Sequence, residues 1–294
     1  MKIAGFTIIR NAIKYDYPVV EAITSILILC DEFYVGVGKS DDDTRNLISS
    51  INSEKIKIID TIWDDNLRQG GAVLAIETNK VFDAIPNDFD WCFYIQSDEC
   101  VHENDLNQIK ENMALYKDDQ SIDGLLFEYK HFYGQYNYIG IGSGWYKNEI
   151  RIIKNNKKIR SYKDAQGFRM INDNKLKVKK TGAFIYHYGW VKPPIAQQAK
   201  QKSFHKMWHN DKWIKNNIPD KKDFDYGNAD LLEMYNGTHP VVFETRIKNA
   251  QWNFIYDKRK VKINIKYKII FLIEKLSGWR IGENKNYKLY IKYI

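Results

Sequence analysis

The residues most clearly suited to metal binding or catalysis are Asp98 and Glu99, which follow a run of five apolar residues at 91–95. A continuous apolar run that ends abruptly at polar residues is typical of a strand buried on both faces, as in the middle of a parallel sheet. Ligands of open α/β sheets bind beyond the carboxyl ends of such strands. Carboxylates at that place can bind Mg²⁺ or Mn²⁺, and such ions usually contact substrate phosphates. The alternative is that the pair only ends the strand and begins the next helix, where acidic residues are common.

Strand and helix patterns alternate over residues 1–100, which predicts repeated β-α-β units with right-handed crossovers. Expected strands cover residues 2–9, 32–37, 55–59 and 91–95, and expected helices cover residues 16–29, 43–51, 71–82 and 103–116. After residue 121 the pattern changes to strands at 124–132, 148–154 and 183–188, a glycine-rich loop at 134–144 and a helix at 195–216. The sequence therefore predicts a Rossmann-like α/β fold. Its mostly parallel central sheet is flanked by helices and joined to a smaller mixed or antiparallel section.

Charge divides the chain into a main part, residues 1–257, and a basic tail, residues 258–294. The tail carries eleven Lys and Arg against two acidic residues, whereas the whole chain has a net charge of +8. The main part therefore has no excess of basic residues, and we expect no nucleic-acid partner. The three cysteines show no paired spacing, and neither a signal peptide nor an apolar run of the ~20 residues that cross a bilayer is visible. These features predict a cytoplasmic protein.

The tail contains a pattern typical of an amphipathic helix at residues 262–276, followed by Trp279. Lysines flank the apolar face, which is formed by Ile265, Ile269, Leu272, Ile273 and Leu276. A basic helix of this kind suits the surface of an anionic membrane. We therefore expect a peripheral location on the inner face of the cell membrane. The alternatives are a helix docked on the main part and a contact between copies of the chain.

Five short motifs occur in an order that carries more information than any one of them. They are T-I-I-R-N at 7–11, G-K-S-D-D-D-T at 38–44, Q-S-D-E at 96–99, R-I-I-K at 151–154 and Y-H-Y at 186–188. In this order they resemble the bacterial family 2 glycosyltransferases with the GT-A fold, especially those that build lipopolysaccharide or capsule glycans. The resemblance covers roughly residues 1–200. It implies a nucleotide-sugar-binding half at 1–100 and an acceptor-binding half at 101–257.

The resemblance implies that Asp98 binds a divalent metal, Mn²⁺ or Mg²⁺, with Glu99 as a second or outer partner and His187 completing the site. A metal there neutralises the charge that develops on the departing diphosphate of a nucleotide sugar. Gln96 departs from the family pattern, which has an acidic residue at this position. An amide can hydrogen-bond a hydroxyl but adds no charge to a metal site, so strict metal dependence is not implied. No partner for His131 is evident from the sequence.

The same resemblance implies donor-binding roles at the ends of the first, second and fourth strands and before the third helix. Arg10 suits phosphate oxygens because its guanidinium is a planar fork, and Arg68 precedes a helix start whose backbone amides attract anions. Asp43 has the alternative role of a helix cap. A UDP-sugar is the favoured donor and a GDP-sugar the alternative. The implied donor-binding residues are Thr7, Arg10, Asn11, Asp41, Asp43, Arg68, Gln96 and Ser97.

An inverting transfer needs a general base that deprotonates the acceptor hydroxyl. The resemblance places this carboxylate between the acidic motif and the late histidine. Asp164 is the first candidate in that region, and Glu149 is held in reserve. Relatives with a V-H-E motif have their carboxylate near the position of Gln166, which has no basic group.

Taken together, the residues and the resemblance predict an enzyme, a metal-assisted and inverting glycosyltransferase of the hexosyltransferase type. Its expected acceptor is a glycan or a lipid-linked acceptor in polysaccharide or lipopolysaccharide biosynthesis. The first alternative, a nucleotidyltransferase on a similar sheet, usually has a glycine-rich basic motif soon after the first strand, and Gly5-Phe6-Thr7 lacks it. The second alternative is a non-catalytic carbohydrate-binding protein that keeps the fold without a base.

Overall fold

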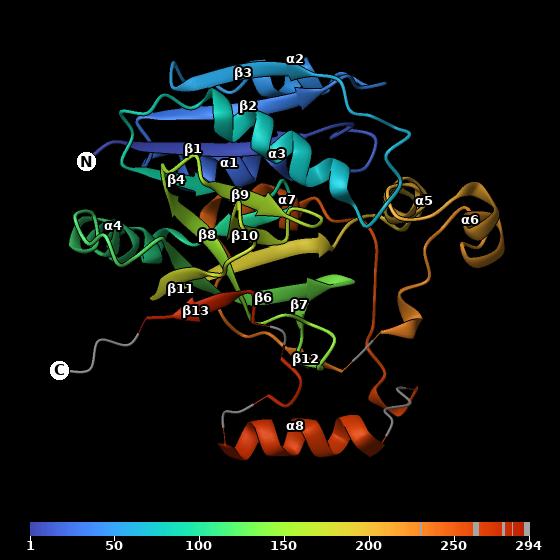
Figure 1. Ribbon diagram of the computed structural model, residues 1–294. Helices are drawn as coiled ribbons and strands as arrows, with labels where there is room; N and C mark the ends of the chain where they lie inside the picture. Colours follow the sequence, from blue (N-terminus) through green and yellow to red (C-terminus); the bar gives the residue numbers. More distant parts are fainter. Residues whose placement is uncertain (230, 261–264, 278–279, 284, 291–294) are drawn as a thin grey trace.

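The computed structural model describes residues 1–229, 231–260, 265–277, 280–283 and 285–290 (Figure 1). Its strands are β1 (Ile3–Ile9), β2 (Glu32–Gly38), β3 (Ile56–Thr61), β4 (Trp91–Tyr94), β5 (Glu99–Val101), β6 (Gly124–Tyr133), β7 (Gln135–Gly140), β8 (Asn148–Lys154), β9 (Ile159–Tyr162), β10 (Gly167–Met170), β11 (Leu176–Trp190), β12 (Leu232–Met234) and β13 (Tyr287–Leu289). Its α-helices are α1 (Val19–Leu27), α2 (Thr44–Ser49), α3 (Ala72–Ala84), α4 (Leu106–Leu115), α5 (Pro194–Lys206), α6 (Asp211–Asn217), α7 (Glu244–Lys248) and α8 (Ile265–Ser277). Short 3-10 turns cover Glu103–Asp105, Tyr226–Asn228, Val241–Phe243 and Lys258–Lys260.

One large sheet holds eleven of these strands, and its amino-terminal half is parallel. In that half the order is β3-β2-β1-β4, with Ala4 opposite Glu32 and Ile3 opposite Trp91. The sheet continues from β4 through antiparallel β8 to β6, which pairs with antiparallel β7 and with parallel β11. β9 and β10 form a separate hairpin. The predicted α/β fold, with a mostly parallel part and a mixed section, is confirmed.

Three local expectations differ from the structure. The segment expected to be a glycine-rich loop contains β7, which returns from β6 through Gly134 at a φ of +70°. The strand expected at 183–188 is the end of the 15-residue β11, whose first part alternates buried and exposed residues and therefore lacks a continuous apolar run. The helix expected at 195–216 is divided into α5 and α6. Asn210 begins α6 as its cap, because its side chain accepts a hydrogen bond from the Trp213 amide.

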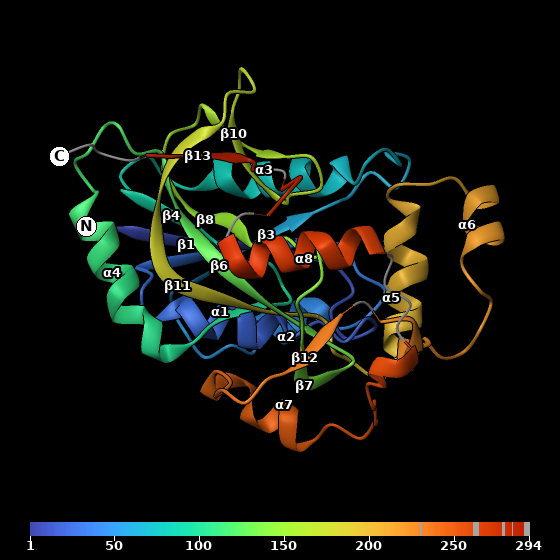
Figure 2. The same cartoon turned by 90° about the horizontal axis from the view of Figure 1, so that it is seen from below.

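Helices cover both faces of the sheet and create two apolar cores. Residues of α1, α2 and α4 pack on one face, whereas α3 and the β9–β10 hairpin pack on the other (Figure 2). β4 contributes to both cores, because Trp91 and Phe93 belong to the first and Cys92 and Tyr94 to the second. The prediction of a strand buried on both faces is confirmed. Its carboxyl end leads directly into the turn that carries Asp98.

The turn after β4 is held by a buried ion pair between Glu99 of β5 and Arg151 of β8. Arg151 donates from Nε to Glu99 Oε2 and from Nη2 to Oε1, both at 2.8 Å. Glu99 also accepts hydrogen bonds from the Tyr129 hydroxyl (2.8 Å) and the Gln96 backbone amide (3.0 Å). Arg151 Nη1 donates to the Gln166 backbone carbonyl (2.9 Å). Charges removed from water need such complete pairing. The pair therefore ties the turn after β4 to β8 and to the loop before β10.

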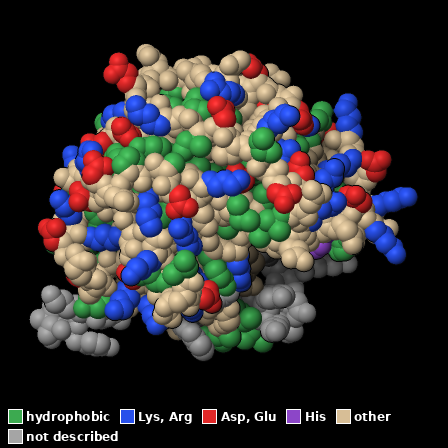
Figure 3. Space-filling model, turned by 45° about the horizontal axis from the view of Figure 1, so that its top comes forward, with side chains coloured by type: hydrophobic (Ala, Val, Ile, Leu, Met, Phe, Trp, Pro, Cys, Tyr) green, Lys and Arg blue, Asp and Glu red, His purple; other side chains and the backbone are tan. Residues whose placement is uncertain are grey.

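The described part of the tail forms α8 and β13. α8 lies along the lower side of the molecule in Figure 1, and Glu274 on this helix binds Arg280 (2.8 Å) and Lys147. β13 pairs in parallel with the beginning of β11. Among the described helices, none combines the length and the apolar character that crossing a bilayer requires. Basic and acidic side chains are interspersed over the face of the molecule in Figure 3.

Replacing Arg151 with Met should lower the free energy of unfolding by ~3–5 kcal/mol, because the buried Glu99 carboxylate then lacks its counter-charge. The double variant Glu99→Met with Arg151→Met should recover much of that loss, since no buried charge remains. Arg45→Ala is the control, because its ion pair with Asp60 is exposed and contributes at most ~1 kcal/mol. Urea denaturation followed by circular dichroism measures all three, and an Arg151→Met protein as stable as the wild type would contradict this account.

Candidate functional site

A cavity of about 690 Å³ lies beyond the carboxyl ends of β1 and β4. In Figure 1, β1 and β2 point towards α5, which forms one wall of the cavity together with the loop after β3. This edge is where open α/β sheets bind ligands, and the volume suits a molecule of nucleotide size. The sequence-predicted residues that line the cavity are Arg10, Asn11, Asp41, Arg68, Gln96, Ser97, Asp98, Asp164 and His187.

Four predicted site residues lie outside the cavity lining: Glu149, which is described with Asp164 below, and Thr7, Asp43 and Glu99. Thr7 lies in the middle of β1 and is fully buried, outside the cavity lining. Asp43 is exposed at the N-cap position of α2, where its side chain makes no capping hydrogen bond to a backbone amide and instead accepts one from the Asn46 side-chain amide (2.6 Å). Glu99 is fully buried, with both carboxylate oxygens bound to Arg151. We therefore leave Thr7, Asp43 and Glu99 out of the proposed site.

Asp98 lies in the turn between β4 and β5, where its carboxylate meets two basic side chains. Lys200 Nζ donates to Oδ2 (3.0 Å), and His187 Nε2 lies 3.8 Å from Oδ1. Burial opposes ionisation of Asp98, but the attraction of nearby basic groups, with Lys200 as the strongest, outweighs it and holds the pKa of Asp98 well below its usual range. Gly189 makes this arrangement possible, because a Cβ there would lie only 2.7 Å from Asp98 Oδ2 and 2.6 Å from His187 Nε2.

His187 is oriented by a second buried histidine, His131 of β6. The two residues are partners in the parallel β6–β11 pair, and their Nδ1 atoms are 2.9 Å apart. His131 Nε2 lies 2.7 Å from the Tyr146 carbonyl, which can only accept, so this nitrogen carries a hydrogen. Burial lowers the pKa of both histidines and keeps them neutral near pH 7. We therefore assign His187 Nδ1–H as donor to His131 Nδ1, which leaves a lone pair on His187 Nε2.

Asp98 Oδ1 and His187 Nε2 thus present two lone pairs at one edge of the cavity. Mg²⁺ and Mn²⁺ accept such ligands and take the rest from water and phosphate. The parts of the chain that the structure describes contain no group of three or more His, Cys, Asp or Glu that could hold a metal alone. Gln96 adds no charge to the site, and its side-chain Nε2 donates to the Ala165 carbonyl (3.0 Å). The residues therefore fit a divalent ion shared with a diphosphate, with Asp98 and His187 as its protein ligands.

Asp164 reaches the same cavity from the loop between β9 and β10. Its neighbours Lys163 and Ala165 have left-handed φ values of +53° and +59°. Such conformations cost non-glycine residues ~1–3 kcal/mol each and cluster at functional sites. Burial raises the pKa of Asp164, which makes it a stronger base than an exposed carboxylate.

The reserve candidate, Glu149, is buried outside the cavity lining. It accepts a hydrogen bond from the Gln166 side chain (3.1 Å), and burial raises its pKa to about 7. The cavity therefore favours Asp164 over Glu149.

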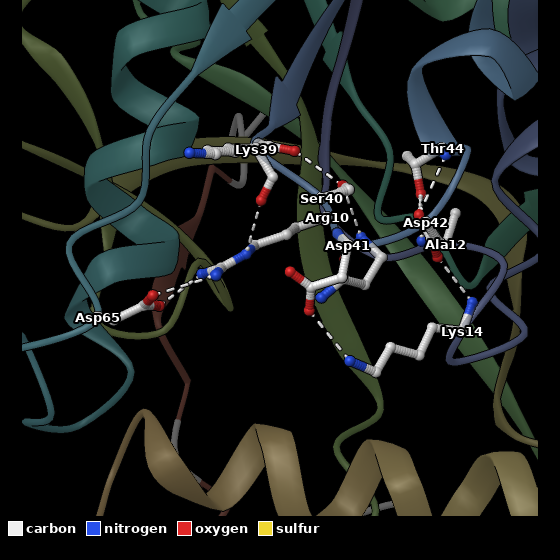
Figure 4. Close-up of polar contacts among 11 residues, drawn as sticks. Arg10, Ala12, Lys14, Lys39, Ser40, Asp41, Asp42, Thr44 and Asp65 are labelled. Atoms are coloured by element: carbon white, nitrogen blue, oxygen red, sulfur yellow. Dashed lines mark hydrogen bonds and ion pairs between the residues drawn. The ribbon is translucent and has the colours of Figure 1, made fainter.

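The far end of the cavity carries residues that the first two motifs contribute. Arg10 binds Asp65 through both Nη atoms (2.5 and 3.1 Å) (Figure 4). Asn11 Oδ1 accepts a hydrogen bond from the Asp41 backbone amide (2.7 Å), and Lys14 pairs with the Asp41 carboxylate (3.0 Å). The ends of β1 and β2 are thus joined by polar contacts. This places Arg10, Asn11 and Asp41, three of the predicted donor-binding residues, around one shared space.

Sequence reasoning missed several residues of the cavity. Trp63 and Asp65 come from the loop after β3, and the Arg10 guanidinium lies 5.9 Å from the centre of the Trp63 ring. A signal for these two was available, because the third parallel strand must end at the same edge as the first. Lys200 offered no such signal, because only tertiary packing brings α5 to the end of β4. His131, which contacts His187 from outside the cavity lining, was missed for a similar reason, since the register of β6 against β11 is not visible in the sequence.

No protein-family model and no curated protein sequence matches this chain. Some solved structures are similar to it at a low level. Residues 1–349 of S. aureus TarS, in complex with UDP, are 16% identical at a TM-score of 0.40, over 69% of this chain and 64% of that one. Another S. aureus TarS structure is 14% identical at a TM-score of 0.40, over 76% of this chain and 41% of that one.

Glucosyl-3-phosphoglycerate synthase from Mycobacterium tuberculosis, in complex with Mn²⁺, UDP-glucose and phosphoglyceric acid, is 18% identical at a TM-score of 0.30. The similarity covers 45% of this chain and 44% of that one. The chain therefore spans less than two thirds of the length of each of these proteins. Similarity at this level does not assign an activity, so the function proposed below depends on the residues of this chain.

His131→Ala should weaken Mn²⁺ binding to the UDP complex by ~10–100-fold, because His187 loses the acceptor that orients its ring. His131→Asn places an oxygen near the former Nδ1 and should restore part of the affinity. His239→Ala is the control, since His239 bonds the Tyr188 hydroxyl (2.8 Å) away from the cavity lining. Titration calorimetry of Mn²⁺ into UDP-saturated protein measures the affinities. Wild-type affinity in the His131→Ala protein would show that the assigned tautomers are wrong.

Proposed function

We propose that this protein is an inverting glycosyltransferase that takes a sugar from a nucleotide-sugar donor. The observation that carries the proposal is that Asp98, Asp164 and His187, which are far apart in the sequence, line one cavity at the carboxyl edge of the sheet. Asp98 and His187 suit the diphosphate end of a donor, and Asp164 suits an acceptor hydroxyl. A transfer reaction needs a proton acceptor of this kind beside the leaving group, whereas a protein that only binds carbohydrate does not.

In the proposed reaction, the acceptor oxygen attacks the anomeric carbon of the donor sugar while the bond from that carbon to the diphosphate oxygen breaks. Asp164 takes the proton of the acceptor hydroxyl, and the electron pair of the broken bond leaves with the nucleoside diphosphate. A divalent ion, Mn²⁺ or Mg²⁺, held by Asp98 and His187 supplies positive charge to the leaving diphosphate when it is bound. The pair of Glu99 and Arg151 keeps the turns that carry Asp98 and Asp164 in place.

We propose a UDP-sugar as the favoured donor and a GDP-sugar as the alternative, bound mainly by residues 1–100. Residues 101–257 then supply the acceptor side, where Tyr146 and Trp190 line the cavity and offer aromatic surface to a sugar ring. The proposed acceptor is a glycan or a lipid-linked acceptor of polysaccharide or lipopolysaccharide biosynthesis. The motif order of the sequence supports this class of acceptor.

The wild-type protein should release nucleoside diphosphate from a member of a panel of UDP-, GDP-, CMP- and dTDP-sugars in the presence of Mn²⁺, with UDP-sugars preferred. Asp164→Asn should lower kcat by ~10²–10⁴-fold and leave donor affinity unchanged, because the amide cannot take a proton. Asp173→Asn is the control, since this carboxylate pairs with Arg169 outside the cavity lining. Full turnover by the Asp164→Asn protein would remove Asp164 from this role. Failure to bind any nucleotide sugar would overturn the proposed function.

We also propose that the tail places the protein on the inner surface of an anionic membrane. α8 turns apolar side chains outward, because Ile269, Leu272 and Leu276 are 54%, 56% and 79% exposed. Their spacing puts them on one face of the helix. Glu274 is buried and bound to Lys147 of the main part. A helix tethered in this way with apolar residues facing solvent suits the interface of a lipid layer. Trp279, which the sequence added to this face, lies outside the described residues.

Replacing Ile269, Leu272 and Leu276 together with Ser should lower affinity for vesicles of phosphatidylcholine and phosphatidylglycerol at least ~10-fold, because each buried side chain contributes ~1.5–3 kcal/mol. Leu115→Ser is the matched control, an exposed apolar residue on α4. Co-sedimentation with the vesicles gives the affinity. The difference from vesicles of phosphatidylcholine alone gives the electrostatic contribution of the anionic lipid. Equal sedimentation of the triple variant and the wild type would favour the docked-helix alternative.

A further inference from the structure

Lys200 is the ammonium group at the diphosphate edge of the cavity. It lies on α5, is 9% exposed and lines the cavity together with Asp98 and His187. Its Nζ donates to Asp98 Oδ2 (3.0 Å) and to the Gly189 carbonyl (2.9 Å). An ammonium group has three N–H donors. Among the described residues, these two contacts leave one N–H without a hydrogen-bond acceptor. Nζ also lies 5.0 Å from the centre of the Tyr17 ring, which lines the same cavity, so the third N–H is on the side of the cavity where a ligand can bind.

The Q-S-D-E motif at 96–99 places fewer carboxylates beside Lys200 than its two acidic residues suggest. Glu99 is bound to Arg151, and Gln96 is neutral, so Asp98 is the carboxylate of the motif that faces the cavity. Two free carboxylates at this place would repel a diphosphate until a metal ion came between them. A carboxylate paired with an ammonium carries no net charge. The edge can therefore accept an anion without a metal.

Lys192, a second buried lysine near Asp98, does not share the position of Lys200. Lys192 is fully buried, and its Nζ donates to the carbonyls of Tyr15 (2.9 Å) and Asp16 (3.3 Å). It is not part of the cavity lining. Lys192 thus holds the loop between β1 and α1, whereas Lys200 faces the space where a ligand binds.

We propose that Lys200 binds the diphosphate of the donor directly, so that the nucleotide binds without a divalent metal. This inference rests on the proposed function, because it takes the cavity to be a nucleotide-sugar site. Hydrogen bonds between an ammonium and a phosphate are charge-assisted and strong. Removal of metal is therefore expected to slow transfer much more than it weakens binding of the donor.

Titration calorimetry with UDP and with uridine, in EDTA and in Mn²⁺, tests this inference. The wild type should bind UDP in EDTA within about tenfold of its affinity in Mn²⁺. Lys200→Met should weaken UDP binding in EDTA by about 10- to 100-fold and leave uridine binding unchanged, which also shows that the variant is folded. Lys200→Arg should keep most of the affinity. Lys202→Met is the matched control, because Lys202 lies on the same helix and pairs with the exposed Asp220.

A double variant separates direct binding from simple neutralisation of Asp98. If Lys200 only balances that charge, Asp98→Asn combined with Lys200→Met should bind UDP in EDTA as the wild type does. If Lys200 contacts the diphosphate, the double variant should bind as weakly as Lys200→Met. The inference is overturned by wild-type affinity in the double variant or in Lys200→Met, by an equal loss in Lys202→Met, or by an equal loss for uridine. A wild type that binds UDP only in Mn²⁺ overturns the inference but not the proposed function, whereas no UDP binding in either buffer overturns both.

Discussion

The buried ion pair between Glu99 and Arg151 is the interaction on which the rest of the site depends. The Glu99 carboxylate accepts four hydrogen bonds, and Arg151 also donates to the Gln166 backbone carbonyl, so the pair joins segments that meet beyond the end of β4. Arg151 holds the turn that carries Asp98 through Glu99 and the loop that carries Asp164 through the Gln166 carbonyl. A buried pair of this kind adds little stability compared with well-packed apolar residues. Its value here lies in orienting two turns that have no regular structure of their own.

Two adjacent acidic residues have opposite roles because of this pair. Successive residues at the start of a strand point to opposite sides, so Glu99 enters the interior while Asp98 faces the cavity. Asp98 then meets Lys200 and the lone pair of His187, whose ring is held by His131. The result is an edge with one balanced carboxylate, which differs from the strongly acidic edge that the sequence motif suggests.

A single continuous segment supplies His187 and Lys200, the two basic residues that meet Asp98. β11 pairs with β5 and β6 near its end, which sets His187 beside Glu99 and opposite His131. The chain then passes through Gly189 and turns into α5, which brings Lys200 to the carboxylate of Asp98. The beginning of β11 also pairs with β13 of the tail. The strand that carries His187 to the cavity is therefore also the strand with which the tail pairs.

The sequence by itself determined the alternation of strands and helices, the strand buried on both faces at 91–94, and the edge of the sheet at which polar residues gather. These features follow from local patterns, because apolar periodicity and turn residues act over a few positions. Only the tertiary structure decided which acidic residue faces the cavity, that Thr7 and Asp43 lie outside it, that Lys200 lines it, and that His131 orients His187 from outside the lining. Those outcomes depend on the register of β6 against β11 and on the packing of α5. Both are contacts between segments far apart in the chain, and neither leaves a local pattern in the sequence.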